Sequence, residues 1–141
     1  MRVIALDVGE RRTGVASGDT ETGLATPAGV IAGLADSTAA AQAASEARSR
    51  SAEVIVVGMP YSMSGRAGAQ AEAVERFVAE LREAAEAVVE TIDERLSTQQ
   101  AERSMRVHGE RRRGRRSPLP TGASDASAAA VILQSWLDAR R

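Results

Sequence analysis

The sequence contains no cysteine, no lysine and a single histidine. The absence of cysteine excludes disulfide frameworks, thiolate zinc sites and cysteine nucleophiles. Its three aromatic residues, Tyr61, Phe77 and Trp136, are too few for the stacking platform with which many proteins bind single-stranded nucleic acid. The candidate functional groups are therefore mainly carboxylates and arginines.

Long apolar runs are also missing. The longest, at 54–57 and 128–133, fall far short of the roughly 20 residues that span a bilayer. The chain begins with a short strand-like run at 3–6, which lacks the apolar length and the cleavage site of a signal peptide. We therefore expect a cytoplasmic protein with no membrane partner.

The chain length predicts one domain. At 141 residues, the sequence is long enough for one core and too short for two cores of ordinary size. Hydrophobic residues make up 43% of it, but 28 residues are alanine, so the core is built largely from small side chains. We predict a single domain over residues 1–141.

Charge is distributed unevenly along the chain. The formal net charge is −1, yet seven arginines lie between Arg103 and Arg116, against the single Glu110. Repulsion among so many like charges is tolerated only where water or a polyanion screens it, so this segment is a solvated loop or binds an anionic partner. We favour nucleic acid as that partner. The arginines expected to bind it are Arg111, Arg112, Arg113, Arg115 and Arg116.

Hydrophobic periodicity predicts the secondary structure. Strands are expected at 3–8, 13–17, 24–31, 53–58 and 88–93, and helices at 37–50, 68–86, 97–108 and from near Ser124 onward. Pro27 should make the third strand irregular or place it near an edge. Three successive strands followed by alternating helices and strands predict an α/β fold. Its mixed five-stranded sheet would be an antiparallel meander of three strands extended by parallel crossovers and flanked by helices.

Two carboxylates occupy positions that cost stability unless they are used. Asp7 ends a strand whose two faces are otherwise apolar. Asp125 lies on the face of the last helix that also carries Ile132 and Trp136. An ionised carboxylate in such a place is costly unless it is paired or binds a cation. The alternatives are a cap of the following turn for Asp7 and an interaction with the helix dipole for Asp125.

A third acidic position is the pair Asp93 and Glu94. It follows a predicted strand at its carboxyl end, where α/β sheets usually bind ligands, although an ordinary acidic first turn of the next helix is an alternative. Three carboxylates from separate elements would repel one another unless a divalent cation neutralised them. Mg²⁺ or Mn²⁺ suits an all-oxygen site and supports phosphodiester hydrolysis. His108 is expected to be a helix C-terminal cation rather than a general base.

Five segments, in order, resemble the YqgF/RuvX family of bacterial proteins. They are 7–16 (DVGERRTGVA), 56–60 (VVGMP), 65–77, 93–101 (DERLSTQQA) and 125–134. No single segment is diagnostic, but together they extend over essentially the whole chain. The resemblance implies an RNase H-like fold and a metal-dependent nuclease. It also implies action on structured nucleic acid, either in maturing the 5′ end of pre-16S rRNA or in resolving Holliday junctions. We expect a monomer or a weak homodimer, because trimming an RNA end needs one active site and symmetric junction cleavage needs two.

The resemblance also assigns roles to individual residues. It places the catalytic and metal-binding carboxylates at Asp7, Glu94 and Asp125, with Asp93 as the alternative to Glu94. Arg12 and Arg95 match family positions expected to hold phosphate or orient the acids. The arginine segment stands where the family typically has a lysine-rich loop, and arginine adds a bidentate grip on phosphate.

Two other functions fit parts of the sequence. The pattern from Asp7 to Gly14 also resembles the first phosphate loop of actin-like ATPases, but those proteins close two domains around a nucleotide and this chain has the length of one. The other alternative is a non-catalytic RNA-binding or transcription-associated factor that uses only its arginine segment. The three candidate acids argue against it, and binding without any metal dependence would be its signature.

Overall fold

The computed structural model describes residues 1–60, 68–93 and 121–140. In these residues one mixed sheet has the order β3-β2-β1-β4-β5. Strand β1 is antiparallel to β2, β2 is antiparallel to β3, and β4 is parallel to both β1 and β5. The predicted meander with parallel crossovers is therefore confirmed. The elements are β1 (Arg2–Val8), β2 (Arg12–Asp19), β3 (Leu24–Ala32), α1 (Ala39–Ser49), β4 (Val54–Met59), α2 (Ala69–Ala84), β5 (Val88–Asp93) and α4 (Thr121–Asp138).

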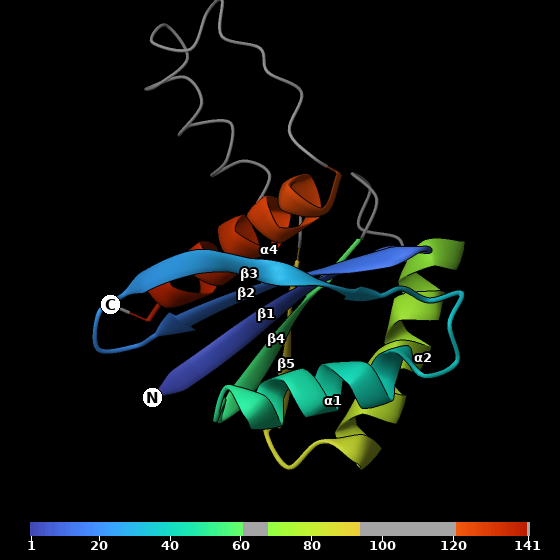
Figure 1. Ribbon diagram of the computed structural model, residues 1–141, viewed down its shortest axis with the longest axis horizontal. Helices are drawn as coiled ribbons and strands as arrows, with labels where there is room; N and C mark the ends of the chain where they lie inside the picture. Colours follow the sequence, from blue (N-terminus) through green and yellow to red (C-terminus); the bar gives the residue numbers. More distant parts are fainter. Residues whose placement is uncertain (61–67, 94–120, 141) are drawn as a thin grey trace, which may run out of the picture.

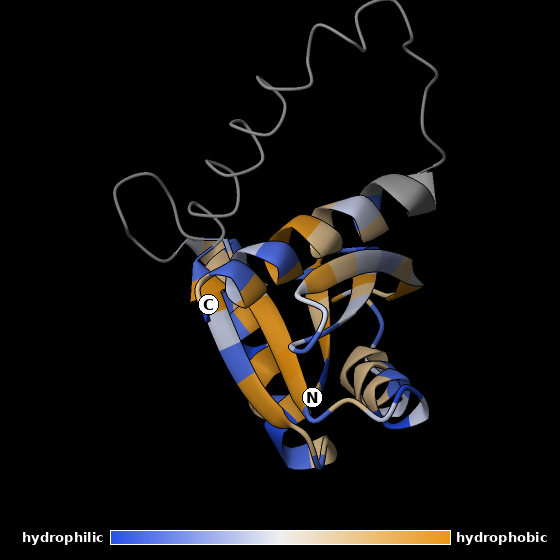
Figure 2. Cartoon of the chain, turned by 90° about the vertical axis from the view of Figure 1, so that its left-hand side faces the viewer, coloured by the Kyte–Doolittle hydropathy of each residue, from blue (hydrophilic) through white to orange (hydrophobic). Residues whose placement is uncertain are grey.

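The sheet is covered on both faces, with α1 and α2 on one side and α4 on the other (Figure 1). Alternation along β1 sends Ile4 and Leu6 to the first layer and Val3 and Ala5 to the second. All four side chains are buried. Figure 2 shows the apolar strands enclosed between the two helical layers. Burial on both faces explains why the strands read as continuous apolar runs.

The last helix begins earlier than predicted. Periodicity placed its start near Ser124, whereas α4 begins at Thr121, directly after Pro120. Gly122 lowers helix propensity but does not stop the helix, so the helical hydrogen bonds extend back to the boundary that proline sets. The helix expected at 97–108, and His108 with it, lies outside the described residues.

Strand β3 is an irregular edge strand, as Pro27 predicted. Its register with β2 shifts between Val15 and Ala16, and Gly29 in the same region has a φ of 147°, a conformation that side chains disfavour. The missing N–H of a proline costs least at such an edge. None of the helices in the described ranges is long and apolar enough to cross a membrane.

A row of small residues on β2 lets α4 approach the sheet closely. The row is Gly14, Ala16 and Gly18, which alternate onto the α4 face. A methyl group built on Gly18 would lie 3.1 Å from Leu133 Cδ2 and 3.3 Å from Leu137 Cδ1. Side chains of α4 therefore fill the space that larger residues on β2 would need.

Gln134 ties α4 to the β2–β3 hairpin. Its Oε1 accepts a hydrogen bond from the Ala25 N–H at 3.0 Å, and its Nε2 donates to the Gly23 carbonyl at 2.8 Å and to Asp138 Oδ1 at 2.9 Å. One side chain thus satisfies two backbone groups of the hairpin, which fixes the helix along the strand direction.

Replacing Gln134 with leucine should lower stability by about 1–3 kcal/mol, because two partly buried backbone groups lose their partner. Thermal unfolding followed by circular dichroism measures the change, which corresponds to a fall of several degrees. Gln70→Leu is the matched control, since Gln70 is exposed on α2. Equal melting temperatures for the two variants would show that the Gln134 contacts contribute nothing.

Candidate active site

Three parallel strands end on the same side of the sheet, and we call this side the carboxyl edge. The carboxyl ends of β1, β4 and β5 lie side by side, and Met59 pairs with Asp93 on the last shared rung of β4 and β5. Helix α4 starts over this same end of the sheet (Figure 1). Ligands of α/β sheets usually bind at such an edge.

Asp7 lies on the α4 face of this edge. Val3 and Ala5 pack into the cluster formed with α4, so alternation places Asp7 on the same side. Its partner across the antiparallel ladder is Gly14. Directly opposed residues have Cα atoms about 4.5–5.5 Å apart and share a face of the sheet, so Gly14 is the immediate neighbour of Asp7 toward β2.

Asp125 lies directly on Gly14. A Cβ built on Gly14 would fall 2.0 Å from the Asp125 carbonyl oxygen and 3.0 Å from the Ala126 nitrogen. Only a residue without a side chain can accept the helix backbone at that distance. The structure therefore brings Asp7 and Asp125, which are far apart in sequence, next to the same residue, Gly14.

Asp125 is paired with Arg12. Arg12 Nε donates to Asp125 Oδ2 at 3.0 Å, and the two side chains are 48% and 32% exposed. Arg12 is the first residue of β2 and shares the α4 face with Gly14. No acidic residue lies in the first turn of α4, so the helix-dipole alternative for Asp125 does not apply.

The resemblance implied that Arg12 holds phosphate or orients the acids, but the residues did not indicate that Asp125 is its partner. The signal for this pairing is the two-residue spacing of Arg12 and Gly14, which puts a cation and an open backbone on one face of a strand. It becomes readable only when the helix that carries Asp125 is known to cross at Gly14.

The other acidic pair is Asp93 and Glu94, of which the structure describes only Asp93. Ile92 packs against the α4 cluster, and alternation then places the partly buried Asp93 on the face covered by α1 and α2. Asp93 therefore lies on the face opposite Asp7. Glu94 is outside the described residues, as are the remaining predicted site residues: Arg95, Arg111, Arg112, Arg113, Arg115 and Arg116.

The backbone next to Arg12 is held by a second segment. Residues 9–12 form a turn closed by the Gly9 N–H to the Arg12 carbonyl at 3.0 Å. Gly33 N–H donates to the Arg11 carbonyl at 3.0 Å, and Leu34 N–H donates to the Gly9 carbonyl at 2.9 Å. A Cβ on Gly33 would lie 2.4 Å from the Gly9 oxygen, so this contact also requires glycine. Sequence reasoning did not assign a role to Gly33.

Within 1–60, 68–93 and 121–140, no group of three or more histidine, cysteine or acidic side chains gathers at one point. The described part of the site holds two carboxylates, Asp7 and Asp125, and one guanidinium, Arg12. A third carboxylate, if Glu94 supplies it, comes from outside these ranges.

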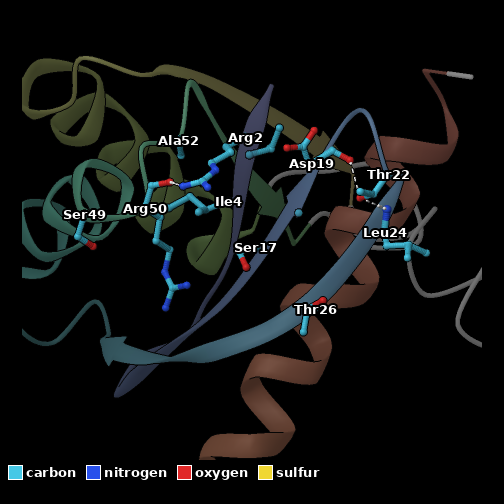
Figure 3. A pocket seen from close by; sticks show the side chains of 12 residues that line it. Arg2, Ile4, Ser17, Asp19, Thr22, Leu24, Thr26, Ser49, Arg50 and Ala52 are labelled. Atoms are coloured by element: carbon cyan, nitrogen blue, oxygen red, sulfur yellow. Dashed lines mark hydrogen bonds between the residues drawn. The ribbon is translucent and has the colours of Figure 1, made fainter.

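A hollow of about 560 Å³ lies at the opposite end of the sheet. Figure 3 shows Arg2 and Arg50 on one side of it and Thr26 on the other. The Glu21 N–H, together with the amine of Met1, lowers the pKa of the lining residue Asp19 below its ordinary value. The described site residues Asp7, Arg12 and Asp125 do not line this hollow.

Comparison with known sequences gives one consistent result. The family model described as RuvX, Holliday junction resolvase, matches residues 1–139. A protein of Synechococcus sp. named "Putative pre-16S rRNA nuclease" is 43% identical over 141 residues, covering 100% of this chain and 80% of that protein. A protein of Roseiflexus sp. with the same name is 41% identical over 143 residues, covering 99% of this chain and 96% of its own.

Comparison with solved structures supports the fold. RuvC of T. thermophilus, solved in complex with a Holliday junction substrate, superposes with a TM-score of 0.62 at 18% identity, over 99% of this chain and 95% of the other. The resolvase of fowlpox virus, solved with Holliday junction DNA, gives a TM-score of 0.59 at 9% identity, over 99% of each chain. The predicted RNase H-like fold is thereby confirmed. Membership of a family of resolvases and nucleases also implies that activity depends on a divalent metal ion.

Proposed function

Because the chain belongs to the RuvX family of Holliday junction resolvases and is a nuclease of phosphodiester bonds, we propose that Asp7, Glu94 and Asp125 are its catalytic carboxylates. The observation that carries this proposal is the meeting of Asp7 and Asp125 across Gly14. Strand β1 and helix α4 are fixed by apolar contacts elsewhere along their length.

The donor set suits a hard divalent cation. Carboxylate oxygens are the ligands that Mg²⁺ and Mn²⁺ prefer, and we propose one of these ions as the cofactor. A positive group already sits on Asp125, since Arg12 binds its Oδ2 at 3.0 Å. That contact supports the view that this carboxylate is built to face a cation.

We assign the remaining roles by position. Asp7 and Asp125, on a central strand and a packed helix, hold their oxygens in fixed places, which is what an orienting group needs. Glu94 is favoured over Asp93 as the third carboxylate, because Asp93 lies on the face opposite Asp7. These groups would hold a divalent cation, which would supply charge stabilisation to the transition state and lower the pKa of the attacking water. Arg95 and the arginine segment bind backbone phosphates.

We propose structured RNA, such as precursor 16S rRNA, as the substrate. The two relatives described above carry the name of that nuclease and are 43% and 41% identical to this chain. Branched DNA is the second candidate, since the matching family is named for Holliday junction resolution and two structural neighbours were solved with junction DNA.

The two substrates can be compared directly. Purified protein is incubated with a precursor rRNA fragment and with a four-way DNA junction, each with Mg²⁺, Mn²⁺ or EDTA. We expect cleavage of the RNA with either metal and none with EDTA. Cleavage of the junction alone would replace the RNA substrate with branched DNA, and equal binding with no cleavage under any condition would favour the non-catalytic factor. Sedimentation of the same samples reports whether a monomer or a weak homodimer is active.

Replacing Arg111, Arg112 and Arg113 together with alanine should weaken nucleic-acid binding without changing sequence preference, because phosphate contacts give affinity rather than readout. The slope of log affinity against log salt concentration should shrink by up to about two to three units. Anisotropy titrations at four salt concentrations measure it. An unchanged slope would mean that these arginines are solvated surface only.

A further inference from the structure

Resting on the function proposed above, we propose that Arg12 is an exchangeable counter-ion. In the metal-free protein it pairs with the Asp125 carboxylate, and when a metal ion binds that carboxylate, the Arg12 guanidinium binds substrate phosphate instead. The observation is the ion pair of Arg12 Nε with Asp125 Oδ2 at 3.0 Å, two residues along β2 from the Gly14 contact that brings Asp125 beside Asp7. A carboxylate intended for a metal is thus held by a side chain that also binds phosphate.

The backbone of Arg12 is fixed while its side chain is accessible. The turn at 9–12 is closed on itself and bonded to Gly33 and Leu34, as the hydrogen bonds above describe. The Arg12 side chain is nevertheless 48% exposed. A change of partner therefore requires only rotations of the arginine side chain, and it leaves β2 and the contact at Gly14 in place.

The energetics favour exchange. Ion pairs between partly exposed side chains contribute about 0–1 kcal/mol, because water screens the charges and ordering two side chains costs entropy. A divalent ion attracts a carboxylate with twice the charge of a guanidinium at the same distance. Asp125 can therefore release Arg12 at little cost. The released guanidinium stays at the site, within reach of any phosphate bound there.

The proposal makes the effect of Arg12 on substrate conditional on metal. Without metal, Arg12 is engaged with Asp125, so its removal should not change affinity for nucleic acid. With metal, Arg12 contributes a charge-assisted bond to phosphate, so its removal should weaken binding. The same removal takes a competing cation away from Asp125, so the metal itself should bind more tightly.

The test compares Arg12→Gln with Arg11→Gln. Arg11 is an exposed neighbour on the same turn, and among the described contacts its side chain has none with Asp125. Its variant loses the same charge as Arg12→Gln but not the ion pair. Mn²⁺ affinity is measured by titration calorimetry. Affinity for a labelled RNA hairpin with a 5′ extension is measured by anisotropy, in EDTA and in Ca²⁺, an ion that also prefers oxygen ligands.

We expect Arg12→Gln to bind Mn²⁺ about three- to tenfold more tightly than the native protein. It should bind RNA equally well in EDTA and about tenfold more weakly in Ca²⁺. Arg11→Gln should weaken RNA binding by the same factor in EDTA and in Ca²⁺, and that factor should be smaller than the loss of Arg12→Gln in Ca²⁺. Equal loss for Arg12→Gln in EDTA and Ca²⁺ would make Arg12 a simple phosphate ligand and overturn the exchange.

Two further outcomes would also overturn it. Weaker Mn²⁺ binding by Arg12→Gln would make Arg12 a positioning residue for Asp125, and no change in any affinity would leave only a structural pair. In each of these cases the native protein still binds metal and cleaves nucleic acid, so the proposed nuclease site stands. Native protein that neither binds Mn²⁺ nor cleaves would instead overturn that site together with the exchange.

Discussion

We expect the Asp7→Asn protein to fold normally and to lose cleavage by about a thousand-fold or more. Asparagine has nearly the same shape as aspartate but loses the negative charge that attracts a cation. A metal ion bound at such a site stabilises the charge of the transition state by several kcal/mol, and each ~1.4 kcal/mol corresponds to a tenfold change in rate. Single-turnover cleavage in Mg²⁺ measures the loss, and circular dichroism checks the fold.

Asp138→Asn is the matched control. Asp138 is exposed at the far end of α4, so the same chemical change should leave the cleavage rate within about twofold. Full activity of Asp7→Asn, in preparations free of contaminating nuclease, would remove Asp7 from the site. Comparable losses in the two variants would indicate an effect of net charge on nucleic-acid binding rather than of a metal ligand.

The Gly14→Ala protein should lose both stability and activity. The added methyl group would meet the Asp125 carbonyl oxygen at 2.0 Å, and a backbone atom of a packed helix cannot turn aside as a side chain can. Overpacking of this kind costs about 1–3 kcal/mol and sometimes more, which predicts a fall in melting temperature of about 3–10 °C. A displacement of α4 by about 1 Å should also slow cleavage by about a hundred-fold.

Gly68→Ala provides the control for the methyl group itself. Gly68 precedes α2, and nothing lies within 4 Å of a Cβ built on it. Its replacement should cost less than about 1 kcal/mol, the usual range for a cap position. Cleavage is compared at a temperature at which both variants are folded. Native stability and activity in Gly14→Ala would contradict the close contact between β2 and α4.

The sheet could be predicted from the sequence because its signals are local. Continuous apolar runs such as 54–57 report burial on both faces, and Pro27 reports an edge. The start of α4 was expected near Ser124 because Gly122 weakens helix propensity, whereas the helix extends back to Thr121, at the boundary that Pro120 sets.

The candidate site could be predicted only in part. Asp7 and Asp125 could be singled out as candidates because a carboxylate among apolar residues costs free energy unless it is paired or binds a cation. The ion pair of Arg12 with Asp125 could not be identified, since it depends on which strand residue lies beneath the start of α4. The sequence left the choice between Asp93 and Glu94 open. Alternation along β5 favours Glu94, because it places Asp93 on the face opposite Asp7.

The contacts of α4 with β2 have a consequence for protein engineering. Helix α4 is located by Gly14 at its start and by Gly18 and Gln134 further along, all of them contacts with β2 and the hairpin that joins it to β3. The position of Asp125 is therefore set independently of the covalent connection that precedes it. The residues from 96 to 120, which follow the proposed site residues Glu94 and Arg95, could be exchanged for those of a relative with different length or charge, and Asp125 would remain beside Asp7. Substrate preference would then be transplantable as a module on an unchanged catalytic scaffold.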